Sequence, residues 1–168
     1  MAGVTANISL VIDVTYAGAG DLGTPKQRVL VQEALALASG TDAVNKADVF
    51  FSDTRQLAAS ASEDLDLAGV LADAFGATIT AAEIVLVYVK AKAANTNSVI
   101  VGAASAPFAG PLGATGTYTI KPGEYYLAVS QSGWAVGAGS TDDLKIANSA
   151  GGTAVDYDIV VIGRTVAA

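Results

Sequence analysis

The side chains of this 168-residue chain that could carry out chemistry are mainly carboxylates set close together. Paired carboxylates can act as acid and base in glycoside hydrolysis, and their oxygens are good ligands for Ca²⁺. Asp66, Asp156 and Asp158 alternate with apolar residues, however, which predicts positions on the solvated face of strands. We therefore favour solvated faces over Ca²⁺ binding or catalysis for all three groups, which are Glu63/Asp64/Asp66, Asp142/Asp143 and Asp156/Asp158.

Other kinds of reactive site lack their essential residues. The chain contains no His and no Cys, so a Ser–His–Asp triad and thiolate metal sites are excluded. The glycines of the segment 18–20 lack the third glycine and the following helix of a phosphate-binding loop. We expect no enzymatic activity, no catalytic residue, no metal and no cofactor.

Composition narrows the choice of partners. The formal net charge is −7 and the nine Lys and Arg residues are scattered singly, which disfavours a nucleic-acid-binding surface. No apolar run reaches the roughly 18 residues that a membrane helix requires, and the N-terminus has no basic segment followed by an apolar core. We therefore expect no nucleic acid and no membrane among the partners.

The aromatic residues near Trp134 allow two interpretations. With Tyr125 and Tyr126, Trp134 could form a platform on which a sugar ring stacks. Alternatively, Trp134 closes one end of a β-sandwich. We favour the second interpretation, because Tyr125 and Tyr126 are neighbours on a predicted strand and must point to opposite faces.

A loop over residues 106–113 holds two prolines and two glycines, so it can be neither helix nor central strand. Pro107 and Pro111 stiffen the loop, and Phe108 and Leu112 give it apolar character. Such a loop could contact a protein partner. It could equally fold back, with Phe108 as a lid on the core.

The first 45 residues are set apart as an N-terminal arm or accessory β segment. Residues 7–16 alternate, which predicts a half-buried strand with Ile8, Leu10 and Ile12 on its apolar face. Residues 27–38 fit either a strand or one face of a helix, and we favour the strand. Residues 46–168 then form the main domain.

The run 81–92 is the predicted central strand of that domain, because its first part is apolar at nearly every position. We expect 98–103 to be its hairpin partner and 132–134 to be a loop. In the strand 117–121, we expect Tyr118 and Ile120 to face inward. We expect Arg164 to face outward at the end of the last strand, 154–164. Further strands are predicted to start at Val49 and to cover 63–67, 125–129 and 142–148, with a single helical turn at 71–75.

About eight to ten short strands with regularly spaced turn signals predict an all-β fold. The expected architecture is an antiparallel β-sandwich, jelly-roll-like, with an N-terminal strand arm or accessory hairpin. No internal repeat is visible.

Several turns and strand edges resemble those of small virion structural proteins of tailed bacteriophages. The segments that carry this resemblance are 64–69, 73–78, 92–99, 107–113, 120–123, 133–136, 143–148 and 157–163. The resemblance covers roughly residues 48–165 and none of the arm. It implies a non-enzymatic capsid decoration (cement) protein on the outer surface of the virion head. The implied partners are the major capsid protein and further copies of the chain, in a homotrimer.

The resemblance transfers no catalytic residue, and it directs attention to contact surfaces. The candidates for a partner interface are Ile8, Leu10, Ile12, Pro107, Phe108, Pro111, Leu112 and Trp134. Through its N-terminal arm, the protein could add a strand to a neighbour. Two alternatives stay open: a carbohydrate-binding β-sandwich module that aids adsorption, and a structural component of the tail or head–tail connector.

Overall fold

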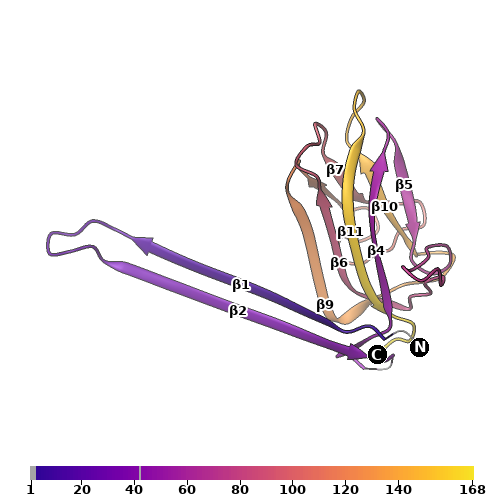
Figure 1. The fold of residues 1–168 in the computed structure, drawn as a ribbon, viewed down its shortest axis with the longest axis horizontal. Coiled ribbons are helices and arrows are strands. Elements are labelled where there is room, and N and C mark those ends of the chain that lie inside the picture. The colour runs from indigo at the N-terminus through magenta and orange to yellow at the C-terminus, as the bar shows by residue number, and fades with distance from the viewer. Residues whose placement is uncertain (1–2, 42) are drawn as a thin grey trace.

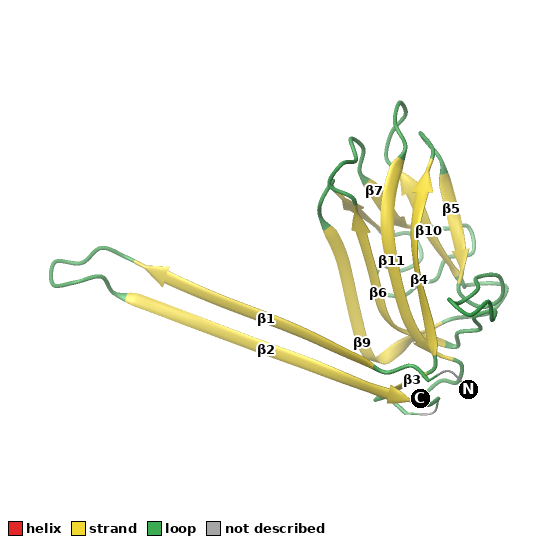
Figure 2. Ribbon diagram, in the orientation of Figure 1, coloured by secondary structure: helices red, strands yellow, loops and turns green. Residues whose placement is uncertain are grey.

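The computed structural model describes residues 3–41 and 43–168, which form a β-sandwich and a long hairpin that projects from it (Figure 1). The described residues contain strands, turns and loops but no helix (Figure 2). The strands are β1 (Ala6–Ala17), β2 (Lys26–Ser39), β3 (Lys46–Ala47), β4 (Val49–Leu57), β5 (Ser62–Asp66), β6 (Glu83–Ala91), β7 (Val99–Gly102), β8 (Thr117–Ile120), β9 (Tyr125–Ala135), β10 (Asp143–Asn148) and β11 (Val155–Arg164).

Two four-stranded antiparallel sheets make up the sandwich, in the orders β5-β10-β7-β8 and β4-β11-β6-β9. The main core lies between them and consists mostly of Val, Ile and Leu. Strand β11 shows the reason: Val155, Tyr157, Ile159 and Val161 alternate with more exposed residues and are buried. The predicted all-β class is confirmed.

Strand β6 is covered on both faces, as its apolar sequence predicted. Ile84, Val87 and Val89 belong to the main core between the sheets. Val85 and Leu86 belong to a second apolar cluster, on the outer face of the same sheet. The base of the hairpin provides this second cover, and the sequence therefore reads as apolar at nearly every position.

The hairpin pairs β1 with β2 in continuous antiparallel register, from Ala6 opposite Leu37 to Ala17 opposite Lys26. The strand favoured for residues 27–38 is therefore present. The predicted half-burial of residues 7–16 is wrong, since most of β1 is exposed on both faces. The hairpin extends away from the sandwich, so only its base has a core to pack against (Figure 1).

The predicted pairing of residues 98–103 with the central strand is also wrong. Strand β7 pairs with β10 and β8, in the opposite sheet. The connection from β6 therefore crosses between the sheets. Asn95 secures it by donating to the Asp156 carbonyl at 2.8 Å and accepting from the Asp156 N–H at 2.9 Å.

Three smaller predictions fail. Residues 71–75 form no helical turn; Asp73 Oδ1 accepts the backbone N–H groups of Phe75 and Ala77 at 2.8 and 2.9 Å and closes a tight loop. Residues 132–134 continue strand β9 instead of forming a loop. Tyr118 is exposed, whereas Ile120 is buried as expected.

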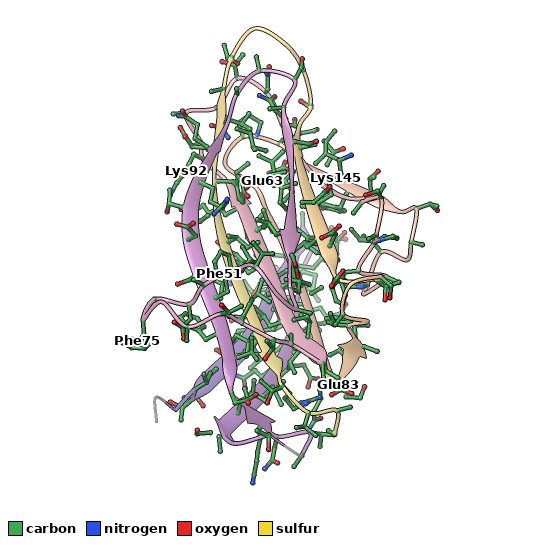
Figure 3. All side chains as sticks on the ribbon, turned by 90° about the vertical axis from the view of Figure 1, so that its right-hand side faces the viewer. Phe51, Glu63, Phe75, Glu83, Lys92 and Lys145 are labelled. Atoms are coloured by element: carbon green, nitrogen blue, oxygen red, sulfur yellow. The ribbon has the colours of Figure 1, made fainter. Side chains whose placement is uncertain are left out.

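Arg164 was predicted to face outward but has no exposed surface. The pairing of β11 with β6 shifts between Ile162 and Gly163, because β6 has one additional residue, Val85, at that point. The extra residue belongs to β6, so Arg164 stays on the outer face of the sheet with Ile162. It is enclosed there by Glu83 and by the backbone at Lys46 and Gln131, whose carbonyls accept from its guanidinium. Its guanidinium binds Glu83 Oε2 through Nε at 3.0 Å and Nη2 at 2.7 Å; Figure 3 labels Glu83 at this end of the sandwich.

Candidate functional site

One face of the hairpin carries a long apolar stripe, in which only Glu33 and Gln27 are polar. In an antiparallel pair, residues directly opposite each other lie on the same face, so the register defines the stripe. Leu10 is 49% exposed and Tyr16 is 73% exposed, so a large part of the stripe is open to solvent. The stripe consists of Ile8, Leu10, Ile12, Val14 and Tyr16 from β1 and Val29, Val31, Leu35 and Leu37 from β2.

The opposite face of the hairpin is mixed in character. Arg28 donates to Asp13 through Nε at 2.8 Å and Nη2 at 2.7 Å, and this pair lies across the two strands. The Arg28 guanidinium lowers the pKa of the Asp13 carboxyl below its ordinary value. Val11 and Leu30 also lie exposed on this face. The two faces therefore differ in that only one presents pairs in which both opposed side chains are large and apolar, such as Ile12 opposite Val31.

The base of the hairpin is fixed to the sandwich by the second apolar cluster. Leu37 is only 3% exposed and packs in this cluster with Leu86 and Ile162. Ile8 and Leu35 pack against the same cluster. The stripe therefore begins in a packed contact with the outer face of the β4-β11-β6-β9 sheet and continues beyond it into solvent.

That outer face carries apolar side chains that extend from the contact with the hairpin to Tyr125 at the start of β9. The strand registers place its residues in adjacent rows, and Leu127 is 43% exposed. The rings of Tyr88 and Tyr125 lie 5.8 Å apart across two neighbouring strands. We call this surface the sheet face; it consists of Phe50, Tyr88, Tyr125, Leu127, Val129 and Val160.

A groove of about 400 Å³ separates the stripe from the sheet face where the two surfaces diverge. Leu10 and Glu33 line its hairpin side, and Leu127, Val129 and Gln131 of β9 line the other. The hairpin leaves the sandwich near the C-terminal end of β9 and then runs away from it (Figure 1). Both walls of this groove are therefore largely apolar and open to solvent.

The loop 107–113 is a lid on the core, which was one of its two predicted roles. Phe108 is 7% exposed, and its backbone N–H donates to the Asp143 carbonyl at 2.8 Å. Leu112 packs against the same core, and Pro107 bridges to Asp143. Pro111 is exposed. The buried Phe108 side chain is thus not available to a partner in this structure.

Trp134 also packs against the main core, as the favoured interpretation expected. Tyr126 lies on the inner side, with its ring 5.0 Å from that of Tyr118. Tyr125 lies on the outer side beside Tyr88. The three aromatic side chains predicted as a possible sugar platform therefore do not share a surface.

The carboxylate groups hold turns and strand pairs. Asp66 accepts from the Ala68 N–H at 2.8 Å, and Asp142 accepts from the Gly139 N–H. Asp158 accepts from Thr54 at 2.6 Å and Lys92 at 2.5 Å.

Two observations bear on chemistry at these carboxylates. Burial, followed by the nearby Asp64, Asp142 and Asp66, raises the pKa of Asp143. Among the residues that the structure describes, no group of three or more His, Cys, Asp or Glu is placed to hold a metal ion.

Glu63 joins a polar network at the edge of the core. It accepts from the Tyr157 hydroxyl at 2.6 Å and from Arg55 Nε at 2.9 Å, and Figure 3 labels it. Burial and this contact with Glu63 raise the pKa of Tyr157 well above its ordinary value. The hydroxyl is therefore a hydrogen-bond donor at all physiological pH values, and the network stabilises the fold.

Sequence reasoning found the stripe residues but missed the sheet face. Tyr125, Leu127 and Val129 were seen as a strand, not as a surface. The sequence did contain a signal, because odd and even positions of β9 and β11 are both apolar over 125–129 and 159–162. A strand with that pattern needs cover on both faces.

Comparisons with models of known protein families, with curated proteins and with solved structures found no match. Within the described part of the chain, no helix is long and apolar enough to cross a membrane.

Proposed function

We propose that this chain is a non-enzymatic structural protein of a tailed-phage virion, a capsid decoration (cement) protein on the outer surface of the head. The observation that carries the proposal is the long hairpin whose apolar stripe is exposed. Exposed contiguous apolar surface on a soluble domain marks a protein contact site. On this proposal the partners are the major capsid protein and further copies of the chain, in a homotrimer.

The sandwich topology supports this proposal as an analogy. Its eight strands form two four-stranded sheets, and all consecutive connections except β7–β8 cross between them. We regard this arrangement as jelly-roll-like, an architecture that viral capsid and lectin domains use. Fold alone does not establish function. The argument therefore depends mainly on the arm.

The proposed mechanism is a clamp. The sandwich is a rigid body with a well-packed core, and the hairpin offers two kinds of contact. Strand β1 is at the edge of its sheet, so its free backbone groups can pair with a strand of a neighbouring protein. The stripe adds apolar contact. Bound across neighbouring capsomers, the protein would resist their separation under internal DNA pressure.

The test uses heads of the encoding phage that were assembled without this protein. Purified full chain is added, and occupancy and position are measured by cryo-electron microscopy. We expect sites on the outer head surface at local three-fold positions. A chain lacking residues 1–45 should show a large loss of occupancy, while full occupancy would rule out the arm mechanism.

The alternatives give different results in the same and related experiments. A connector or tail component would appear at a six-fold or twelve-fold position and leave the head surface empty, which would contradict the proposal. A carbohydrate-binding module would bind a glycan array and lose binding on Trp134→Ala. The packing of Trp134 against the core gives that alternative no support.

A further inference from the structure

We propose that the apolar stripe of one copy docks on the sheet face of a second copy, so that the hairpins hold copies of the chain together. The occupant is thus another molecule of this chain. The inference deepens the self-association part of the proposed function and rests on that function for its biological role. The contact itself requires only the two surfaces.

The stripe needs a partner because of its length. Strand β1 has 12 residues, so at about 3.4 Å per residue the hairpin reaches about 40 Å. Only its base is packed, through Ile8, Leu35 and Leu37. A two-stranded hairpin in water is marginally stable on its own. The exposed part from Leu10 to Tyr16 would therefore gain stability from a covering surface.

The sheet face has the chemistry to be that surface. The base of the stripe already packs on Leu86 and Ile162, which lie in the same sheet as the sheet face. Leu127 and Val129 adjoin these residues in the β6–β9 register and are exposed. The base of the stripe thus already packs on this sheet, and the exposed sheet face beside that contact is apolar in the same way.

One molecule cannot close this contact on itself. Beyond its base, the hairpin runs away from the sandwich, so the distal stripe and the sheet face of one copy lie apart (Figure 1). Each copy therefore carries one free stripe and one free sheet face, in equal number. Contact between copies covers both surfaces. Each hairpin docks either on the other copy of a dimer or on the next copy in a closed ring.

The available area is of the right order. The exposed side chains of the stripe, each about half exposed, offer roughly 600 Å², against about 800 Å² per partner in a standard interface. The charges at the borders are compatible. Glu33, opposite Leu10, is the one acidic residue on the hairpin face that carries the stripe, and Lys90 lies next to Tyr125 at the border of the sheet face. Asp158, also at that border, is paired with Lys92.

The experiment is sedimentation velocity on the purified full chain across micromolar concentrations, with native mass spectrometry for stoichiometry. We expect dimers or trimers for the unmodified chain. Ile12→Glu should weaken self-association by about a hundredfold or more, because it buries a carboxylate in an apolar contact. Val11→Glu is the matched control: it adds the same charge one residue away, on the other face of the hairpin, and should leave self-association nearly unchanged.

Leu127→Glu tests the receiving surface and should weaken self-association as strongly. Mixing the Ile12→Glu and Leu127→Glu chains should restore one-to-one complexes, because one intact stripe then meets one intact sheet face. Circular dichroism melting of each variant checks that the fold is kept, since both positions are exposed.

Three results would overturn the inference. They are an unmodified chain that stays monomeric at all concentrations, an equal effect of Val11→Glu and Ile12→Glu, and no effect of Leu127→Glu. A monomeric chain that still occupies phage heads would reject this inference and leave the proposed function intact. A chain that self-associates but does not bind phage heads would support this inference and reject the proposed function.

Discussion

Arg164 and Glu83 form a buried ion pair where the ends of several strands meet. Arg164 has no exposed surface, and besides Glu83 it donates to the backbone carbonyls of Gln131 and Lys46 at 3.4 Å. Gly133 lies against the pair with a φ of +79°, and a Cβ there would lie 2.8 Å from Arg164 Nη2. Glycine is therefore required by both backbone conformation and space. Removing one partner of such a pair leaves an uncompensated charge in the interior.

Glu83→Ala should therefore lower the free energy of unfolding by about 3–5 kcal/mol, as measured by urea denaturation. The double variant Glu83→Leu with Arg164→Met removes both charges and should recover more than half of the loss. A single-variant effect below about 1 kcal/mol, the range of surface pairs, would show that the guanidinium finds other partners.

Tyr157→Phe removes the hydrogen bond to Glu63 and should cost about 1–2 kcal/mol at neutral pH, because the acceptor is a charged carboxylate. The pKa of Tyr157 is raised above its ordinary value of 10.0 on folding. Its contribution is therefore complete below pH 10 and is lost as pH rises through the folded-state pKa. The stability of the unmodified chain should fall more steeply above pH 10 than that of Tyr157→Phe. Parallel curves would contradict this assignment.

At the scale of elements, sequence patterns predicted most strands but not their partners. Alternation locates β11 and β10 because burial on one face is a local property of the sequence. The partner of β7 depends on whether the chain after Lys92 turns back or crosses to the other sheet. Asn95 stabilises the crossing through its contact with Asp156, 61 positions away, which no local pattern reports.

The same reasoning explains what could be foreseen of the candidate site. The sequence predicted the apolar face of residues 7–16 but not its exposure. Apolar and polar residues alternate in the same way whether or not another part of the protein covers the strand. Phe108 was left between two roles for a similar reason. Its burial depends on the space beneath the loop, which the opposing strands create.

The hairpin as an element depends on its base. Leu37→Ala should remove much of the anchoring contact with Leu86 and Ile162 and cost about 2–3 kcal/mol. Hydrogen exchange in β1 and β2 should accelerate more than exchange in β6. Leu22→Ala is the control, since Leu22 is fully exposed in the hairpin loop and should change neither quantity. Equal exchange in the hairpin of both variants would show that the arm does not rely on this anchor.

At the scale of the whole molecule, acidic side chains outnumber basic ones and give a net charge of −7. The free energy of unfolding should therefore depend on pH in the range where carboxylates are protonated. Lys92 and then Thr54 lower the pKa of Asp158 below its ordinary value of 3.8. Its contribution is therefore present above that value and is lost as pH falls through the lower folded-state pKa. Asp158→Asn should unfold with a flatter pH dependence below pH 4 than the unmodified chain, in thermal melts. An unchanged slope would mean that the pair with Lys92 is not maintained in solution.

The position of the last strand has a consequence for the order of folding. The ribosome delivers the hairpin before the sandwich, yet the base of the hairpin packs on Ile162 of β11, the last strand of the sandwich in chain order. Strand β4 also lacks its sheet partner until β11 has been made. Until β11 has been made, a nascent chain thus carries a hairpin without its full anchoring contact, and such a hairpin is only marginally stable. The arm therefore takes its fixed position only after β11 has joined the sheet, although β1 and β2 come first in the chain.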